Sequence, residues 1–289
     1  AISDITDIPT KFASEVIGMS EDPATAVRKK KDSSLVRSAE AVRDGEALAM
    51  ISAGNTGATM ASALLKIGRI RGVSRPAIAT PIPVLGRANP NILLDSGANA
   101  ECNPEWLVQF AEMGAVYARD RFSTHKPKIG LLSIGEEPGK GSPLVKEAFE
   151  LLDDQDWQVR CSGEFIGNVE GRDLMNPDID VIVTDGFTGN VALKTLEGTA
   201  KAIVGALLDV FSSSPEAKEG ASLLAPSLLP LYETLDPESV GGAILLGVKG
   251  VSMVSHGSSG PKAIFNAIST AYELSIDKHV EHLEQVIKR

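Results

Sequence analysis

Residues 180–190 read DVIVTDGFTGN, and this stretch decides the fold class. The three β-branched residues from Val181 to Val183 form the short apolar run that is typical of a buried strand. A polar turn then leads into the long apolar segment 191–211, which we predict to be a helix. A buried strand followed directly by a helix is the unit from which parallel α/β sheets are built.

The same alternation of strand, turn and helix continues along the chain. Residues 1–44 have a mostly helical pattern, and Pro261 marks the start of a C-terminal helix. We predict strands at 47–53, 77–84, 91–95, 128–134 and 180–184, and a late pair of strands within 243–255. The 289 residues therefore favour one α/β domain, 1–289, in which helices cover both faces of a mostly parallel sheet.

The composition is that of a globular protein with an acidic surface. The chain has a net charge of -10 and only 4% aromatic residues, whereas nucleic-acid-binding proteins present basic faces and stacking aromatic rings, so no nucleic-acid partner is expected. Cys102 and Cys161 lack metal-ligand spacing, which predicts no metal site and no disulfide, and Cys102 is expected to be inert.

No signal peptide or membrane span is recognisable, which favours the cytoplasm.

Polar, glycine-rich turns follow several of the predicted strands. The turn 52–57, SAGNTG, opens a helix, and its glycines and unpaired N–H groups suit a phosphate group without needing a lysine. Similar turns lie at 95–100, 135–141, 185–190 and 256–260. Because ligands of open α/β sheets bind beyond the carboxyl ends of strands, we expect these turns to meet at one edge. The alternative is that the glycines serve packing alone.

Six segments, taken in order, closely resemble the PlsX family of bacterial phosphate acyltransferases. They are 52–57 (SAGNTG), 94–99 (LDSGAN), 107–114 (LVQFAEMG), 134–137 (IGEE), 185–190 (DGFTGN) and 255–259 (SHGSS). The resemblance implies a three-layer α/β/α fold similar to those of phosphotransacetylases and isopropylmalate dehydrogenases, and a homodimer. It also implies an enzyme of phospholipid synthesis that converts acyl-acyl-carrier-protein and inorganic phosphate to acyl phosphate and free carrier protein, without a cofactor.

The start of the sequence departs from the family pattern. Members usually begin with a strand that ends in an Asp-x-Met-Gly-Gly-Asp turn, and no such segment occurs here, where the sequence starts at Ala1. Either the chain is a fragment or its start is missing from the sequence. If the first strand and its turn are truly missing, we expect an exposed edge of the sheet and the loss of part of the phosphate site.

The implied reaction requires positioning more than acid–base catalysis. Phosphate is already an anionic nucleophile, and the leaving thiol has an ordinary pKa of about 8.5. What remains is to hold the two substrates and to stabilise the tetrahedral oxyanion with fixed donors. We assign phosphate binding to five residues of the first turn: Ser52, Gly54, Asn55, Thr56 and Gly57.

The catalytic candidates come from two other turns. Asn190 and Lys194 lie four residues apart, on one face of the predicted helix, where they would hold phosphate or the oxyanion, and Asp185 would orient one of them. The alternative makes Asp185 a helix cap and Lys194 a solvated side chain. His256 is a candidate acid or phosphate ligand, the alternative being a histidine bonded to backbone. Four further residues are expected to border the site: Asp95, Asn99, Gly186 and Ser258.

Other charged residues are assigned to supporting roles. Glu136 and Glu137 would repel phosphate, so we expect them to fix their loop or to contact a neighbouring subunit. An acidic carrier protein requires basic partners. The candidates are Arg69, Arg71, Arg75, Lys126 and Lys128.

The segment 212–235 is apolar and contains Pro226 and Pro230. We predict a loop at 212–220 and an apolar helical hairpin that lies either at a dimer interface or on a membrane surface. The membrane alternative implies a peripheral position at the inner face of the membrane, near the downstream glycerol-3-phosphate acyltransferase.

Four other functions are weighed against the acyltransferase. A kinase is disfavoured because 135–141 lacks the spacing of a P-loop, and a nicotinamide dehydrogenase because no Gly-x-Gly-x-x-Gly follows a strand. A short-chain phosphotransacetylase that uses coenzyme A thioesters and a non-catalytic membrane-associated scaffold of lipid synthesis stay open as alternatives.

Overall fold

The computed structural model describes residues 8–235 and 241–287, and its centre is an eight-stranded sheet. The strand order is β1-β8-β7-β2-β3-β6-β4-β5. The strands are β1 (Ala49–Ser52), β2 (Ala77–Ile82), β3 (Asn91–Leu94), β4 (Lys128–Leu132), β5 (Glu164–Val169), β6 (Val181–Val183), β7 (Ala243–Leu246) and β8 (Val251–Val254). Every predicted strand is confirmed, although several are shorter than predicted. Only β5 was not predicted.

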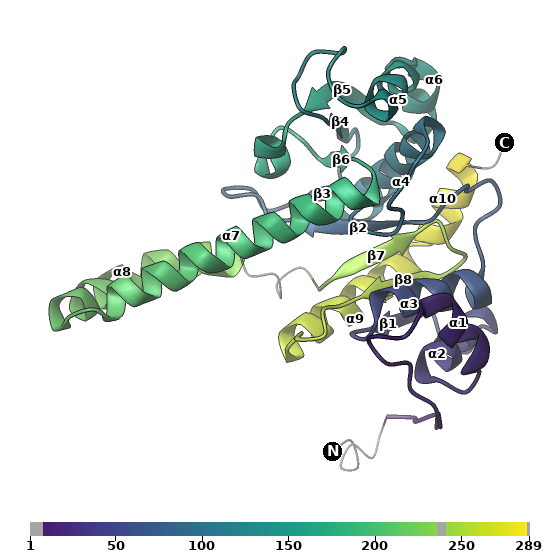
Figure 1. Ribbon diagram of the computed structural model, residues 1–289, viewed down its shortest axis with the longest axis horizontal. Coiled ribbons are helices and arrows are strands. Elements are labelled where there is room, and N and C mark those ends of the chain that lie inside the picture. The colour runs from purple at the N-terminus through teal and green to yellow at the C-terminus, as the bar shows by residue number, and fades with distance from the viewer. Residues whose placement is uncertain (1–7, 236–240, 288–289) are drawn as a thin grey trace.

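Ten α-helices surround the sheet in the described part of the chain (Figure 1). They are α1 (Pro23–Lys29), α2 (Ser34–Arg43), α3 (Thr56–Ser62), α4 (Pro104–Phe122), α5 (Pro143–Asp153), α6 (Gln155–Cys161), α7 (Gly186–Ser212), α8 (Pro215–Leu235), α9 (Pro261–Ile276) and α10 (His279–Ile287). A π-helical turn, Ala63–Ile67, extends α3, and a 3-10 turn spans Gly171–Met175. The N-terminal region is less helical than predicted, because 8–22 holds no helix; residues 1–7 lie outside the described residues.

The strand directions divide the sheet into two parallel parts. β1 runs parallel to β8, and β3, β6, β4 and β5 run parallel to one another. Three antiparallel pairs lie between these parts: β8 with β7, β7 with β2, and β2 with β3. Four of the seven neighbouring pairs are therefore parallel, which makes the sheet mixed.

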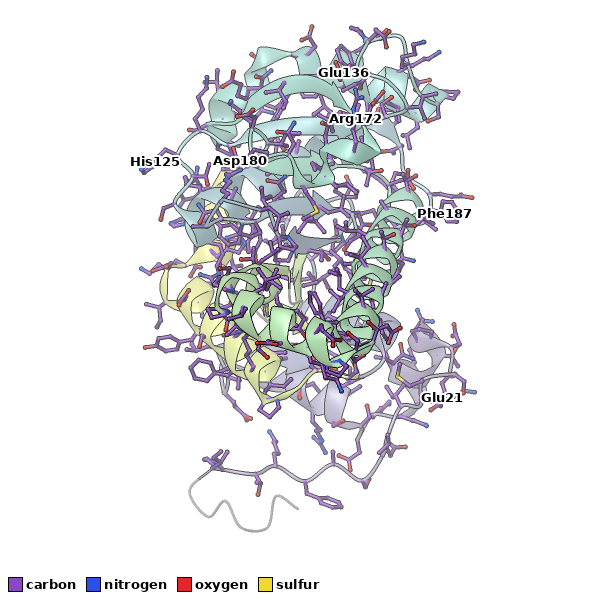
Figure 2. The ribbon with its side chains drawn as sticks, turned by 90° about the vertical axis from the view of Figure 1, so that its left-hand side faces the viewer. Glu21, His125, Glu136, Arg172, Asp180 and Phe187 are labelled. Atoms are coloured by element: carbon purple, nitrogen blue, oxygen red, sulfur yellow. The ribbon has the colours of Figure 1, made fainter. Side chains whose placement is uncertain are left out.

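The three reversals separate the glycine-rich turns. The carboxyl ends of β1 and β8 point to one edge of the sheet, whereas those of β3, β6 and β4 point to the opposite edge. The prediction that all the turns meet at one edge is therefore wrong. Figure 2 shows the same separation across β6, since Asp180 precedes this strand and Phe187 follows it on the other side of the molecule.

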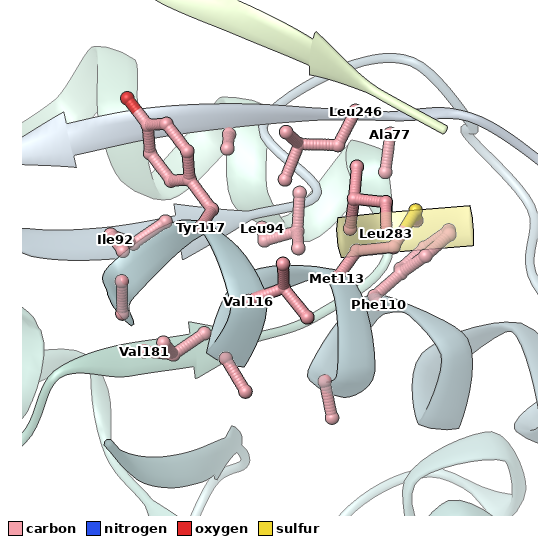
Figure 3. Packing of buried hydrophobic residues seen from close by; sticks show 14 of the residues in the cluster. Ala77, Ile92, Leu94, Phe110, Met113, Val116, Tyr117, Val181, Leu246 and Leu283 are labelled. Atoms are coloured by element: carbon pink, nitrogen blue, oxygen red, sulfur yellow. The ribbon is translucent and has the colours of Figure 1, made fainter. Parts of the chain in front are cut away.

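Alternating side chains along the strands bury both faces of the sheet. One face packs against α4, α5, α6, α9 and α10, in the largest hydrophobic cluster. Figure 3 shows its centre, where Phe110, Met113 and Val116 of α4 lie near Leu94 and Val181 of the sheet. The other face, here called face 2, packs against α2, α3 and the π-helical turn at one end and against α7 at the other. Helices on both faces give three layers, as predicted.

The helices α7 and α8 form a hairpin that projects beyond the sheet (Figure 1). α7 confirms the predicted helix 191–211 but begins earlier, at Gly186. The loop predicted at 212–220 is wrong, because Ser214 accepts a hydrogen bond from Ala217 N–H and Pro215 suits the first helical turn, so α8 starts there. The hairpin is therefore made by two long helices and is not confined to 212–235.

Candidate functional site

The turn after β1 is held by its own side chains. Ser52 Oγ accepts a hydrogen bond from Gly54 N–H at 3.1 Å. Asn55 caps α3, since its Oδ1 accepts from Ala58 N–H at 3.0 Å, while its Nδ2 donates to two backbone carbonyls of the N-terminal region. The Asn55 side chain is therefore committed to the fold and has no donor left for a ligand. The Asn55 side chain is therefore not a phosphate ligand, in contrast to the prediction.

The glycine at position 57 is needed for packing. A Cβ there would lie 2.7 Å from Cγ of Pro23, in the first turn of α1, so only glycine lets the two helices approach this closely. For Gly57, the alternative that the glycine serves helix packing is therefore the correct one. Ser52 is partly exposed and Thr56 is exposed, so their hydroxyl groups and the first N–H groups of α3 remain accessible.

The turn after β8 lies directly beside the turn after β1. Ser255 N–H donates to the Ser52 carbonyl at 2.8 Å, and Gly257 approaches the carbonyl of Ala53. His256 Nδ1 lies 2.7 Å from Ser258 Oγ and accepts from Ser258 N–H at 3.3 Å. An accepting Nδ1 places the proton of the neutral ring on Nε2, which makes Nε2 a donor on an exposed side chain. Neither turn contains a carboxylate.

Asp95, by contrast, organises the turn after β3. Its carboxylate accepts from the backbone N–H groups of Ile78, Gly97, Ala98 and Asn99 and from the Asn99 side chain. Burial nevertheless raises the pKa of this carboxyl above its ordinary value. These hydrogen bonds come from its own loop and, through Ile78, from β2, so Asp95 builds the turn and joins it to the sheet. Asn99 is held in turn by donating to the Pro76 carbonyl at 2.9 Å.

The turn after β6 packs tightly against this loop. Asp185 caps α7: its Oδ1 accepts from Thr188 N–H and its Oδ2 from the Thr188 hydroxyl. It therefore orients neither Asn190 nor Lys194, and the cap alternative is the correct one. Gly186 N–H donates to the Asn99 carbonyl at 2.8 Å, and a Cβ at Gly186 would lie 2.7 Å from that oxygen. The role of Gly186 is thus close packing.

Asn190 and Lys194 have different surroundings in the first turns of α7. Asn190 is exposed beside Gly97, whose Cβ position lies 3.7 Å from the Asn190 amide oxygen. The Lys194 ammonium forms an ion pair with Glu197 at 2.6 Å. Asn190 is therefore available to a ligand at the turn after β3, whereas Lys194 is a surface lysine with a carboxylate partner.

Although the two groups of turns end at opposite edges, they border the same face of the sheet. Met50 and Ile78 lie in the cluster beneath α2 and the π-helical turn, so Ser52 and Thr80, two residues further on, point to face 2 as well. Ala98 packs against that cluster together with Met60 of α3. Leu193 of α7 also packs on face 2. The predicted site residues thus surround one strip of face 2, between α3 and α7.

Two hydroxyl groups that the sequence analysis did not assign lie within this strip. Thr80 Oγ1 and Ser96 Oγ are 2.6 Å apart, and Ser96 Oγ donates to the Ile78 carbonyl. Because the Ser96 hydroxyl proton is used in this bond, the Thr80 hydroxyl donates its own proton to Ser96 Oγ. The lone pairs of Thr80 Oγ1 then remain available to accept a hydrogen bond from a ligand. Thr80 is partly exposed, like Ala243 on the neighbouring strand. The available signal was that Thr80 is the only hydrogen-bonding side chain in the apolar strand AIATPI.

The remaining candidates lie away from this strip. Glu136 pairs with Arg172, and the Glu137 carbonyl accepts from Asn168, so this pair fixes its loop as expected (Figure 2). Burial raises the pKa of the Cys102 thiol to about 12, which fits the prediction that it is inert. No cluster of three metal-ligating side chains occurs among residues 8–235 and 241–287.

Comparisons with known proteins identify the family. Residues 6–281 match the model of a family described as "Fatty acid synthesis protein". A curated protein of Elusimicrobium minutum (strain Pei191), named "Phosphate acyltransferase", is 48% identical over 286 residues, which are 99% of this chain and 82% of that protein. The chain belongs to this family. A second relative, from Myxococcus xanthus (strain DK1622), carries the same name and is 46% identical over 93% of this chain and 75% of its own length.

Family membership confirms the predicted acyltransferase family, and solved structures confirm the fold. A phosphotransacetylase from Streptococcus pyogenes matches with a TM-score of 0.58 and 19% identity, over 87% of this chain and 70% of that chain. The EutD phosphotransacetylase from Staphylococcus aureus matches with a TM-score of 0.52 and 17% identity, over 86% and 67%. These similarities support the three-layer α/β/α fold. None of the described helices has the length and apolar content that a membrane span requires.

Proposed function

We propose that this phosphate acyltransferase moves the acyl group of an acyl-acyl-carrier-protein thioester onto inorganic phosphate. The reaction site is the strip of face 2 between α3 and α7. The observation that carries this assignment is the meeting of two carboxylate-free turns, 52–57 and 255–260, at the ends of β1 and β8. In an acidic chain, a surface with hydroxyl, backbone N–H and imidazole donors and no carboxylate favours an anion.

Phosphate is assigned to the β1–β8 side of the strip. The donors are the Ser52 and Thr56 hydroxyl groups, the free N–H groups at the start of α3 and His256 Nε2–H. These groups supply hydrogen bonds and partial positive charge without a fixed counter-ion, which suits a nucleophile that has to leave with the product. Gly54 keeps the backbone of this turn open to the ligand.

The thioester carbonyl is assigned to the centre of the strip. A phosphate oxygen attacks the carbonyl carbon, and the carbonyl oxygen becomes an oxyanion that His256 or the Asn190 amide stabilises by hydrogen bonding. When this intermediate collapses, the C–S bond breaks, the acyl–oxygen bond is retained and the thiol leaves as thiolate. With an ordinary thiol pKa of about 8.5, the leaving group departs as thiolate and takes its proton from water.

The test is thiol release from a long-chain acyl-carrier-protein, with and without inorganic phosphate, while hydroxylamine traps the acyl phosphate. Phosphate-dependent release with trapped product supports the proposal. Release from acyl-coenzyme A and none from acyl-carrier-protein would instead support the phosphotransacetylase alternative. Release without phosphate dependence would contradict both, and the absence of any turnover would leave the scaffold alternative.

The hairpin of α7 and α8 is proposed as a contact surface between two copies of the chain. Its exposed apolar residues include Leu208, Val210, Leu223, Leu224 and Leu229. Exposed apolar patches of this kind are uncommon on monomers. We therefore expect another surface to bury the leucines of this projecting pair of helices. A membrane surface is the second candidate cover, and it implies a peripheral position in the cytoplasm at the membrane face.

A further inference from the structure

The loop between α3 and β2 gathers cations that have no carboxylate partner among the described residues. Eleven arginines lie in the described residues, and seven of them have a carboxylate within 4.0 Å. Of the other four, three belong to one short loop: Arg69, Arg71 and Arg75. In a chain with ten excess negative charges, a local group of unneutralised arginines is unusual.

The β7–β8 turn adds Lys249 to this loop. Ile70 N–H donates to the Gly247 carbonyl at 3.0 Å, and Lys249 N–H donates to the Gly68 carbonyl at 2.9 Å. These hydrogen bonds join the two segments, and Arg69, Arg71, Arg75 and Lys249 are all exposed. We call these four residues the basic loop. It leads into β2 on the right-hand side of Figure 1.

Contacts with α4 and within the loop hold the backbone between Arg69 and Arg75 in place. Gln109 of α4 accepts from Ser74 N–H at 2.8 Å and donates to the Gly72 carbonyl at 3.0 Å. The Arg75 guanidinium lies 4.9 Å from the centre of the Trp106 ring, and Arg69 donates to the Ser74 carbonyl. A preorganised charged surface loses little entropy when a partner binds, which suits recognition of a protein.

The basic loop adjoins the turn after β3. β2 runs antiparallel to β3, so its first residues lie beside the end of that strand, where Ala79 is opposite Leu94. Pro76, next to Arg75, accepts a hydrogen bond from Asn99. Lys126 and Lys128, the other sequence candidates, lie at the start of β4 and thus at the opposite edge, and Lys126 already pairs with Glu164.

We propose that the basic loop is the docking surface for the acidic carrier protein that brings the acyl thioester. This inference rests on the proposed function and adds the partner's position. A carrier seated on these four cations places its thioester arm at the turn after β3, from which the arm runs along face 2 past Asn190. Charge complementarity of this kind raises the association rate and orients the partner.

Charge reversal tests the surface. The double variant Arg71→Glu/Lys249→Glu removes two exposed cations whose side chains make no hydrogen bond or ion pair with the described residues, so we expect the fold to be preserved. Lys31→Glu/Lys146→Glu, at two exposed positions elsewhere, is the matched control with the same change in net charge. We expect the test variant to weaken binding of the carrier protein at least tenfold, measured by titration, and the control less than twofold.

Steady-state kinetics separate docking from chemistry. With acyl-carrier-protein, the test variant should have a raised KM, with the KM for phosphate unchanged. With acyl-pantetheine, which lacks a protein, both variants should match the wild type. Equal binding of the carrier protein by the test variant and the control would overturn the docking surface. A loss of activity with acyl-pantetheine as large as that with acyl-carrier-protein would also overturn it. So would a loss of activity seen only with acyl-coenzyme A. Failure of the proposed function is distinct, since the wild type would then release no thiol in a phosphate-dependent way.

Discussion

At the scale of single residues, His256 has a distinct position among the histidines. Its Nδ1 is engaged by Ser258, which leaves Nε2–H as a donor at the junction of two turns. His125 is also exposed but lies in a loop before β4, on the opposite side from Phe187 in Figure 2. These two histidines therefore form a matched pair for mutagenesis.

We expect His256→Ala to lower kcat/KM for phosphate-dependent acyl transfer by about 100-fold, the lower end of the range for a lost oxyanion donor. His125→Ala should leave the rate within twofold of the wild type. The measurement is thiol release at saturating acyl donor, over a series of phosphate concentrations. Equal rates for His256→Ala and wild type would remove His256 from the proposed site.

At the scale of elements, the contact between α7 and the Asp95 loop depends on Gly189. A Cβ at this position would overlap the carbonyl oxygen of Asp95 and lie 3.0 Å from the Thr184 side chain. Gly198, further along the same helix, has no atom within 4 Å of its Cβ position. One helix thus contains a glycine that packing requires and another that it does not.

We expect Gly189→Ala to lower the free energy of unfolding by about 3 kcal/mol, because the helix has to move away from the loop. Gly198→Ala should raise it by up to about 1 kcal/mol, since alanine has the higher helix propensity. Urea unfolding followed by circular dichroism measures both values. Similar stability of the two variants would mean that α7 is not pressed against the loop.

The attachment of α10 to α4 depends on one carboxylate. Asp120 Oδ2 lies 2.7 Å from Nδ1 of the buried His279 and 3.2 Å from Nδ1 of His282. Burial by itself would raise the pKa of Asp120, but the hydrogen bonds and charges of these two histidines outweigh it and hold the pKa below its usual value. A carboxyl with a depressed pKa stabilises the fold above its ordinary pKa of about 3.9.

We expect Asp120→Asn to lower the free energy of unfolding at pH 7 by about 2 kcal/mol, the contribution of hydrogen bonds to a charged group. The difference from wild type should shrink as the pH falls below about 4, because the carboxyl of the unfolded wild-type chain then takes up a proton, and the stabilisation is lost completely once the folded carboxylate is protonated too. Urea unfolding at pH 7 and pH 3 measures it, with Asp277→Asn as an exposed control. A difference independent of pH would show that the charge of Asp120 is irrelevant.

At the scale of the whole molecule, the hairpin is the part whose surface is least covered. The side chains of Leu208 and Leu224 are 60% and 53% exposed, and each lies on one of the two helices. Figure 1 shows both helices reaching away from the sheet, so much of the hairpin lies away from the proposed reaction site. Substitutions in this part of the hairpin therefore test subunit association without changing the proposed reaction site.

We expect Leu208→Glu/Leu224→Glu to convert a dimer to a monomer in sedimentation velocity, because charged side chains are costly to bury at an interface. Thr199→Glu/Ser227→Glu, at two exposed polar positions on the same helices, is the control. A monomeric wild type would refute the proposed subunit contact, and flotation with liposomes would then test the membrane alternative.

Much of the architecture followed from local patterns. Strands such as β6 were predictable because a short run of β-branched residues suits a strand buried on both faces, and α7 because a long apolar segment follows a capped turn. Asn55 and Asp185 were harder to interpret, because a side chain that caps a helix and one that binds a ligand occur in the same kind of turn. Hydrogen-bond partners distinguish them, and partners such as Gly18 are distant in sequence.

The sequence by itself determined every strand except β5, most of the helices, the α/β class and the family, because periodicity and short motifs depend only on neighbouring residues. Only the tertiary structure decided which turns meet. Strand direction depends on pairings between distant segments, and three antiparallel pairs send the turns of β1 and β3 to opposite edges. Because side chains alternate along each strand, both groups of turns nevertheless border the same face of the sheet. Thr80 and Ser96 are in contact on this face, and no local sequence pattern predicts that contact.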